Sequence, residues 1–384
     1  MAGLKLLVVS TPMGPLGQGL GGGVELTLEA VLRGLIQCGH QLSLVAAEGS
    51  ALKLPELQQL WLEPGVPQPS WQHQPRQAPV QIPANGLLPR FWQRAQAVQH
   101  HFDAVLNLGY DWLPFWLTAS FTTPLFHLVS MGSVSDAMDA VIEATAAAFP
   151  QRLAFHTATQ AGDFSLPAAP ILVANGFDFS RYNFCATPQR QLGWVGRIAP
   201  EKGLEDAAQA AAALGWPLRI WGLREDEDYA AAVERSVPAG TLDWRGFLPT
   251  DQLQAELGRC AALLNTPKWN EAFGNVVVEA MACGAPLISN HDSPIAVECG
   301  GVSPPCIRLV PFNDARALSS TVTELLSNPT ERGRLGTAAR CWMEQSCSLR
   351  LALVRYEALF IRLGQQAVTN QVALTKSQQN PCQD

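Results

Sequence analysis

The stretch LGWVGRIAPEKGLEDAAQAAAAL, residues 192–214, decides the fold. It opens with four mostly apolar residues, Leu192–Val195, and continues into a loop that has Gly196 and Gly203 at its two ends. An alanine-rich stretch over 204–214 then predicts a helix. Strand, glycine-bounded loop and helix in this order form the repeating unit of a parallel α/β sheet, so the stretch predicts a doubly wound domain.

The same alternation of short β-type runs and helical patterns extends in both directions. There are more such runs than one open sheet holds comfortably, and an aperiodic polar segment over 178–191 separates two series of them. The sequence predicts an α/β protein of two doubly wound Rossmann-like domains, residues 1–183 and 184–345, that face each other across a cleft. We expect a long surface loop over Pro55–Gly86. The predicted strands are Leu4–Ser10, Gln41–Ala47, Ala104–Leu108, Pro124–Val129, Leu153–His156, Ile171–Ala174, Leu192–Val195, Leu218–Trp221, Ala261–Asn265, Pro286–Ser289 and Ile307–Val310.

The composition excludes several classes of protein. Of the 384 residues 47% are hydrophobic, so most of the chain can form packed cores. Lys and Arg number 26 against 33 Asp and Glu, which gives a net charge of −7. Proteins that coat nucleic acids, or bind membranes through basic patches, need an excess of cations, so we expect no nucleic-acid partner. Any anion site must be built locally from a few cations.

Cysteine usage and hydropathy bear on the cellular compartment. The nine cysteines are odd in number and scattered, without a CxxC pair, which indicates neither a disulfide framework nor a zinc ribbon. This usage fits a reducing cytosol, and we expect a cytoplasmic protein. No run of about 20 residues is free of polar interruption, so we expect no transmembrane segment, and any membrane contact would be peripheral.

A glycine-rich loop follows the first predicted strand, with five glycines among residues 17–23. Glycines let a ligand approach the backbone, and a helix predicted over Val24–Cys38 would present unpaired N–H groups there. Three of the glycines match GxGxxG, with Glu48 as the ribose-binding acid of a dinucleotide fold. Thr11–Leu16 separates the glycines from the strand, however, which is atypical of that fold. A flexible loop and an anion- or sugar-binding loop at the cleft are the alternatives.

Two cations, Arg197 and Lys202, lie in the loop between Gly196 and Gly203. Arg197 can bind phosphate oxygens through two N–H groups at once, and Lys202 can act as a point charge. Open α/β sheets bind ligands at the carboxyl ends of their strands, where this loop lies. The alternative is surface ion pairing of Lys202 with Glu201 or Glu205, worth about 0.5 kcal/mol.

Two acids lie eight positions apart, Glu271 and Glu279. A helix that begins near Gly274 or Asn275 would direct its first N–H groups at an anion or a hydroxyl-rich ligand. Glu279 would then lie one turn inside a mostly apolar helix, where a vicinal diol is a suitable partner for its carboxylate. The alternative is a solvated Glu279 on an outward helix face.

The acidic run Glu225–Asp228 imitates a metal-binding DxD motif. It falls at a predicted helix start, where acids favour the helix dipole, so we interpret it as structural and predict no metal site.

Taken together, these motifs resemble the GT-B glycosyltransferases of family 4, which use nucleotide-activated sugars and retain the anomeric configuration. The resemblance spans residues 4–365. It is carried by the Arg197 and Lys202 loop, the segment from Glu271 to Glu279 with Phe273, Gly274 and Asn275, and the stretches Gly22-Gly23-Val24-Glu25, Gly39-His40 and Asn175-Gly176-Phe177-Asp178.

The resemblance implies roles for individual residues. Arg197 and Lys202 would hold the donor diphosphate, and Glu279 the ribose hydroxyls. Glu271 would orient the donor sugar, together with the backbone of Phe273, Gly274 and Asn275. Gly22 and Gly23 would line the first-domain side of the cleft, and His127 would contact the sugar unless it is an ordinary strand-end histidine. A C-terminal helix over 346–366 would cross back to the first domain. Separately, the polar composition of residues 367–384 predicts a disordered tail.

One segment departs from the family pattern. Members commonly carry a Gly-Gly-x-x-Glu turn after the strand that corresponds to Pro286–Ser289, whereas this chain has NHDSPIAVE over 290–298. The resemblance therefore does not define the acceptor side there, and His291 is interpreted as a loop residue.

A narrower resemblance concerns the acceptor. VSTPMGPLG (9–17), GGGVELT (21–27), YDWLP (110–114), GWVGRIAPEKG (193–203) and TPKW (266–269) are similar to UDP-glucose:tetrahydrobiopterin glucosyltransferases. Tyr110 and Trp112 could stack on a flat ring, although such a stretch is also typical of a core. We predict Gly19, Glu25, Tyr110 and Trp112 as acceptor-side residues.

The function implied is a retaining, metal-independent hexosyltransferase without a cofactor, which moves glucose from UDP-glucose to a small-molecule hydroxyl such as that of a reduced pterin. A lipid or polysaccharide acceptor is one alternative. A non-catalytic nucleotide-sugar or pterin binding protein and an NAD-dependent oxidoreductase are alternatives of other classes.

Overall fold

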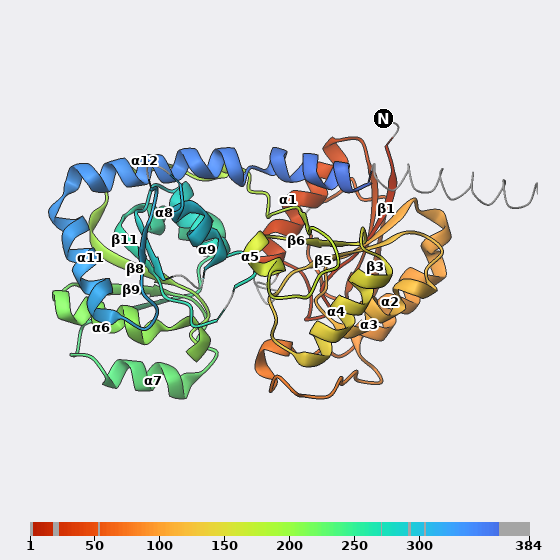
Figure 1. The fold of residues 1–384 in the computed structure, drawn as a ribbon, viewed down its shortest axis with the longest axis horizontal. Helices are drawn as coiled ribbons and strands as arrows, with labels where there is room; N and C mark the ends of the chain where they lie inside the picture. Colours follow the sequence, from red (N-terminus) through yellow and green to blue (C-terminus); the bar gives the residue numbers. More distant parts are fainter. Residues whose placement is uncertain are drawn as a thin grey trace, which may run out of the picture.

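The computed structural model describes residues 3–17, 23–52, 54–269, 271–290, 293–302 and 305–360. They form two domains, each built on one parallel β-sheet with helices on both faces (Figure 1). The first half of the chain forms a seven-stranded sheet and the second half a six-stranded sheet. The predicted α/β fold with two doubly wound domains is therefore confirmed.

The first sheet has the strand order β3-β2-β1-β4-β5-β6-β7, and all neighbouring strands are parallel. Its order changes direction between β1 and β4, and ligands of doubly wound sheets bind beyond the carboxyl ends of the strands at such a point. The strands are β1 (Lys5–Val9), β2 (Gln41–Ala47), β3 (Gln59–Glu63), β4 (Ala104–Asn107), β5 (Leu125–Val129), β6 (Leu153–Phe155) and β7 (Ile171–Leu172).

Both faces of this sheet are buried, which explains the continuous apolar runs of its central strands. Leu6 and Val8 of β1 share a core with α1, whereas Leu7 and Val9 point to the other face and share a core with α2. The helices are α1 (Gly23–Gln37), α2 (Leu87–Val98), α3 (Trp112–Trp116), α4 (Asp136–Ala148) and α5 (Ala158–Ala161), with 3₁₀ turns at Trp71–His73, Gln99–His101, Leu117–Ser120 and Phe179–Arg181.

The second sheet has the order β10-β9-β8-β11-β12-β13 and is also parallel throughout. Its central strands are β8 and β11, so the loop that follows β8 emerges at the middle of the sheet. The strands are β8 (Gln189–Val195), β9 (Leu218–Trp221), β10 (Leu242–Gly246), β11 (Cys260–Asn265), β12 (Leu287–Asn290) and β13 (Arg308–Val310).

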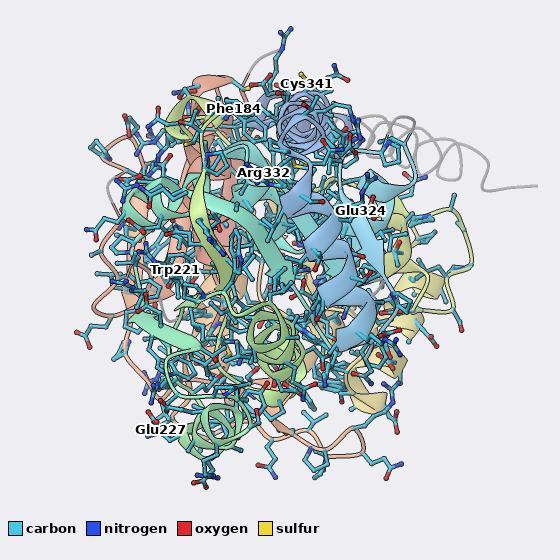
Figure 2. The ribbon with its side chains drawn as sticks, turned by 90° about the vertical axis from the view of Figure 1, so that its left-hand side faces the viewer. Phe184, Trp221, Glu227, Glu324, Arg332 and Cys341 are labelled. Atoms are coloured by element: carbon cyan, nitrogen blue, oxygen red, sulfur yellow. The ribbon has the colours of Figure 1, made fainter. Side chains whose placement is uncertain are left out.

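Helices again cover both faces. Leu264 of β11 shares a core with α6 and α11, whereas its neighbour Leu263 shares a core with α9 and α12. In the view from this domain's side, Trp221 of β9 lies inside the domain, and Glu227 and Cys341 lie toward opposite ends (Figure 2). The helices are α6 (Leu204–Leu214), α7 (Glu227–Arg235), α8 (Thr250–Gly258), α9 (Asn275–Ala282), α10 (Pro294–Gly300), α11 (Ala315–Ser327) and α12 (Pro329–Ser346), with a 3₁₀ turn at Pro200–Lys202.

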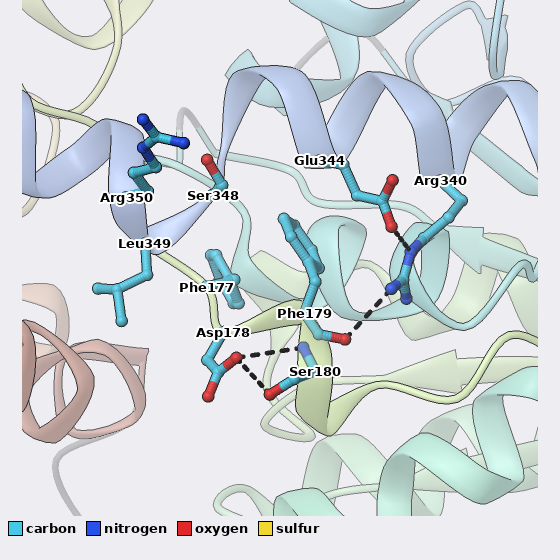
Figure 3. Close-up of a pocket in the computed structure, with 9 residues that line it drawn as sticks. All are labelled: Phe177, Asp178, Phe179, Ser180, Arg340, Glu344, Ser348, Leu349 and Arg350. Atoms are coloured by element: carbon cyan, nitrogen blue, oxygen red, sulfur yellow. Dashed lines mark hydrogen bonds and ion pairs between the residues drawn. The ribbon is translucent and has the colours of Figure 1, made fainter.

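The chain passes between the domains twice, and the two passages lie side by side (Figure 3). The Phe177 amide donates to the Cys347 carbonyl over 3.0 Å, and the Leu349 amide donates to the Phe177 carbonyl over 2.9 Å. Helical residues 349–360 then pack on the first domain, where Tyr356 and Phe360 join the core that contains α1. The open pocket beside this crossing is lined by Phe177, Asp178, Phe179, Ser180, Arg340, Glu344, Ser348, Leu349 and Arg350.

Two sequence-based expectations change. The segment Pro55–Gly86 contains the edge strand β3 as well as irregular chain, and the second domain has an edge strand, β10, that the sequence did not reveal. Both are edge strands with partly exposed side chains, so neither produces a continuous apolar run. Within the part of the chain that the structure describes, no helix combines the length and the hydropathy needed to cross a membrane.

Candidate functional site

Loops at the carboxyl ends of β8 and β11 meet beside the first domain. Gly203 ends the loop after β8 with φ +62°, and a Cβ atom there would lie 2.1 Å from the Thr266 carbonyl oxygen. Only glycine fits this close approach without displacing the backbone of the second loop. The contact brings Lys202 next to the segment that leads into α9.

Lys202 and Glu271 form an ion pair, with Nζ 2.5 Å from Oε1, and the two side chains are 19% and 12% exposed. The Lys202 ammonium also lies 5.0 Å from the centre of the Trp269 ring. Glu205, which the sequence offered as a partner, instead pairs with Lys268 over 2.6 Å. The expectation of a simple surface pair between Lys202 and Glu201 or Glu205 is therefore wrong, and the ammonium is held between two loops of the site.

Arg197 lies at the domain junction. Its Nη2 donates to Glu201 Oε1 over 2.8 Å and to Gln72 Oε1 over 2.7 Å, and its Nη1 donates to Glu225. Gln72 belongs to the first domain, so the guanidinium bridges the two domains. Arg197 therefore faces the junction, whereas the Lys202 ammonium contacts Glu271 and Trp269 of the second domain.

The helix α9 begins after a glycine. Gly274 precedes the helix with φ +92°, and as the N-cap residue it provides no side-chain hydrogen bond to the first N–H groups. A Cβ atom on Gly274 would lie 2.9 Å from Ser293 Oγ, so the turn requires glycine. Uncapped N–H groups and the helix dipole favour an anion or hydroxyl oxygens at this point.

The segment before α9 touches the first domain. The Asn175 side-chain amide donates to Asn275 Oδ1 over 2.7 Å. The ring of Phe273 stacks on Phe177 with centroids 6.3 Å apart. Predicted site residues Glu271, Phe273, Gly274 and Asn275 are thus brought together with Lys202 at the junction.

Glu279 is 3% exposed, so a solvated position on an outward helix face is wrong. The Tyr182 hydroxyl donates to its Oε1 over 3.4 Å, a long hydrogen bond. Burial raises the pKa of Glu279 to about 7, and the hydrogen bond from Tyr182 offsets this only in part. A carboxylate accepts about four hydrogen bonds, which leaves capacity for a pair of hydroxyl groups.

Two residues of the first domain that the sequence analysis did not single out, His156 and Thr157, contact the segment before α9. The Thr157 hydroxyl donates to the Ala272 carbonyl over 3.3 Å. His156 is 6% exposed, its ring centre lies 5.9 Å from that of Phe273, and its Nδ1 has no hydrogen-bond partner among the described residues. Burial lowers the pKa of His156 to about 4, so the ring is neutral. Their position at the end of a predicted strand was the available signal.

The structure corrects the sugar-contact prediction for His127. This side chain is fully buried, and its ring stacks on Phe115 with centroids 4.4 Å apart. Its two ring nitrogens are bonded, Nδ1 to Asn107 over 3.1 Å and Nε2 to Thr118 over 2.9 Å. Burial lowers the pKa of His127 to about 3. It is therefore the strand-end core histidine that the sequence kept as the alternative.

The four residues predicted to face the acceptor are Gly19, Glu25, Tyr110 and Trp112, and the three that the structure describes differ in their surroundings. Tyr110 is buried, and its hydroxyl donates to the Gly132 carbonyl over 3.1 Å, so its ring offers no open stacking face. Trp112 is half-buried and stacks on Trp116, which is 59% exposed. Gly23 is the first residue of α1, and Glu25 lies in its first turn. Gly19, Gly22 and His291 lie outside the described residues.

The acidic run has a structural role for Asp226, which caps α7 by accepting from the Tyr229 amide over 2.8 Å. Glu225 does not belong to the cap and instead pairs with Arg197. Within the described ranges, no group of three or more His, Cys, Asp or Glu side chains is placed to hold a metal ion.

Comparison with known proteins extends this description. Residues 182–342 match the family model of glycosyl transferases group 1. A 2-deoxystreptamine N-acetyl-D-glucosaminyltransferase from Streptomyces fradiae is 31% identical over 156 residues, which are 38% of this chain and 36% of the relative. A D-inositol 3-phosphate glycosyltransferase from Salinispora arenicola is 28% identical over 232 residues, 49% of this chain and 50% of the relative. The matches thus span half or less of these curated relatives.

Solved structures match over nearly the whole chain. Anabaena HepE in complex with UDP and glucose has a TM-score of 0.72 at 17% identity, over 92% of this chain and 98% of that one. Sucrose-phosphate synthase from Thermosynechococcus elongatus has a TM-score of 0.72 at 17% identity, over 96% and 100%. The chain therefore has the GT-B fold, and its residues 182–342 match the family model of glycosyl transferases group 1.

Proposed function

We propose that the protein is a retaining glycosyltransferase that moves glucose from UDP-glucose to a hydroxyl of a small-molecule acceptor. The observation that carries the proposal is the Lys202–Glu271 ion pair beside Arg197 and the uncapped start of α9, at the carboxyl edge of the second sheet. Names of the related enzymes support a small acceptor, since two of them name 2-deoxystreptamine and three name D-inositol 3-phosphate. Structures of HepE with UDP and with UDP-glucose support the donor.

The donor would be held along the second domain. Arg197 and Lys202 would bind the diphosphate, because Arg197 lies at the domain junction and Lys202 follows it in the same loop, paired with Glu271. Glu279 would accept the two ribose hydroxyls, which suits a buried carboxylate whose one hydrogen bond from a described side chain, that of Tyr182, is long. Glu271 and the backbone of 273–275 would orient the sugar.

The reaction requires stabilisation of charge on the leaving diphosphate. Fixed cations and helix N–H groups, arranged before the bond breaks, can supply several kcal/mol of such stabilisation. These groups take the part that a divalent metal plays elsewhere, so we propose a metal-independent transfer. Retention would follow from attack on the same face, with the departing phosphate oxygen accepting the proton of the acceptor hydroxyl.

For the acceptor we propose a reduced pterin such as tetrahydrobiopterin. The support is the sequence similarity of residues 9–17, 21–27 and 110–114 to glucosyltransferases of that acceptor class. Residues 9–17 and 110–114 lie in the first domain, at or just after the carboxyl ends of β1 and β4.

The test is incubation with UDP-glucose and a panel of acceptors, including tetrahydrobiopterin, 2-deoxystreptamine and inositol phosphate, with detection of conjugates by mass spectrometry. We expect a glucosylated pterin of α-configuration by NMR, with turnover unchanged by EDTA. A loss of activity in EDTA that Mg²⁺ restores would reject metal independence. UDP binding in calorimetry without any conjugate would favour the non-catalytic alternative, and NAD binding without UDP binding would favour an oxidoreductase.

A further inference from the structure

A segment of the first domain, residues 64–78, runs across the carboxyl end of its sheet and is fixed at several points. The Gln68 amide donates to the Pro12 carbonyl over 2.9 Å, and the side-chain nitrogen of Gln68 donates to the Gln81 carbonyl over 2.7 Å. Trp71 is 2% exposed and shares a core with Tyr110. The segment is therefore anchored, although it has little regular structure.

Gln72 follows the buried Trp71 in this anchored segment. The Ser70 hydroxyl accepts a hydrogen bond from the Gln72 amide over 3.3 Å, which fixes the short 3₁₀ turn at Trp71–His73. Because Trp71 is buried and the Gln72 amide is hydrogen-bonded to Ser70, the backbone at Gln72 is fixed, and this restricts the direction of its side chain. That side chain reaches the second domain, where its Oε1 accepts from Arg197 Nη2 over 2.7 Å.

The acceptors around Arg197 differ in charge. Glu201 and Glu225 come from the second domain and are carboxylates. Gln72 comes from the first domain and is a neutral amide. A third carboxylate would add negative charge where a diphosphate has to bind, whereas an amide oxygen fixes the orientation of the guanidinium without adding charge.

We propose that Gln72 is a positioning residue that acts through Arg197, so that the orientation of the diphosphate-binding guanidinium depends on the approach of the first domain. The inference rests on the proposed function, because it takes the donor diphosphate as the ligand of Arg197. It assigns a role to a segment in which sequence patterns predict only a surface loop. The chemical requirement at position 72 is a neutral hydrogen-bond acceptor on a side chain of glutamine length.

The test compares Q72M and Q72E with Q74M. Methionine keeps the length of the side chain and removes the acceptor. Glutamate keeps the acceptor and adds charge. Gln74 is the matched control, since its side chain donates to the Ser70 carbonyl within the same segment over 3.4 Å. UDP-glucose affinity is measured by calorimetry, kcat and KM by product formation, and folding by the thermal unfolding midpoint.

We expect Q72M to weaken UDP-glucose binding about tenfold, as for loss of one hydrogen bond to a charged group. Q72E should weaken it at least as much, and Q74M should change it less than about twofold. In an R197M background Q72M should have no further effect, because a residue that acts through Arg197 has nothing left to position.

Three results would overturn the inference. One is wild-type affinity and turnover in Q72M, another is tighter binding in Q72M, which would make Gln72 a competitor of the diphosphate, and the third is a full Q72M effect in the R197M background. A wild-type protein that neither binds UDP-glucose nor forms a conjugate would instead remove the proposed function, and the inference with it.

Discussion

The ammonium of Lys202 lies 2.5 Å from the Glu271 carboxylate, and this ion pair joins the loop after β8 to the segment before α9. Both side chains are mostly buried, so the pair is screened less by solvent than an exposed one. The pair fixes the Lys202 ammonium between the segments that lead into α6 and α9. A diphosphate bound there would interact with a cation whose position is already fixed.

Replacement of that charge should stop transfer. We expect K202M to lower kcat/KM by about 100-fold or more, since the leaving group loses a preorganised cation. The fold should survive, because both loops are also held by Gly203 and Thr266. Steady-state kinetics with UDP-glucose measures the effect.

Lys268 provides the matched control. It lies two residues after Thr266 and pairs with Glu205 and Asp206 at the start of α6. K268M should keep kcat/KM within about threefold of the wild type. Equal losses in K202M and K268M would mean that the assay reports general charge or folding, not the phosphate role of Lys202.

The fold could be predicted from the sequence because its central strands are buried on both faces. Runs such as Leu4–Ser10 and Leu192–Val195 are apolar without alternation, and this signal does not depend on tertiary context. The edge strands β3 (QLWLE) and β10 (LDWRG) were not predicted because polar or charged residues interrupt their short apolar runs. The loops that end at Gly203 and Gly274 could also be predicted, because a glycine before a helix start is a local sequence signal.

The cross-domain part of the site could not be predicted in this way. Gln72 and Arg197 are 125 positions apart and meet only after two domains have folded. For His127 the resemblance predicted a ligand contact where the structure has a core residue. The Asn107 and Thr118 side chains that hydrogen-bond its ring are distant in sequence and could not be identified from the residues around His127. Sequence periodicity reports which face of an element is buried, not which polar partner it finds there.

Glu279 should make donor binding depend on pH. Its pKa of about 7 in the ligand-free protein means that the carboxylate, which we propose accepts both ribose hydroxyls, is fully formed only above neutral pH. We expect UDP-glucose affinity, measured by calorimetry, to weaken as the pH falls from 8 to 6. In E279Q affinity should be lower and flat over this range. A wild-type affinity that does not change with pH would contradict the ribose role.

Glu279 should also make the stability of the ligand-free protein depend on pH, but here a rise in pH is unfavourable, whereas it favours donor binding. Its folded pKa, about 7, lies above the ordinary value of 4.5, so the folded state holds a proton more tightly than the unfolded state. Stability should therefore fall as the pH rises from 4.5 through 7. At pH 8 E279Q should be more stable than the wild type by on the order of 3 kcal/mol, and at pH 4.5 by almost nothing.

Urea unfolding at a series of pH values measures this difference without ligand. The exposed Glu324 of α11 offers the control, and E324Q should match the wild type at each pH. A constant offset between E279Q and the wild type from pH 4.5 to 8 would show that the substitution acts through packing rather than through the buried charge.

Arg340 should determine the stability of the crossing between the domains. Its guanidinium donates to the Phe179 carbonyl over 3.2 Å (Figure 3). It also donates to the carbonyls of Tyr182 and Ala282 over 2.9 and 2.6 Å, so one side chain from α12 ties the first passage to the end of α9. We expect R340M to lower the free energy of unfolding by about 2–4 kcal/mol, because buried carbonyls lose a charged donor. R340K should fall in between, since an ammonium cannot reach three divergent acceptors.

The exposed Arg350 at the same pocket is the control, and R350M should stay within about 0.5 kcal/mol of the wild type. Equal midpoints for R340M and R350M in urea unfolding would show that the three hydrogen bonds do not stabilise the crossing.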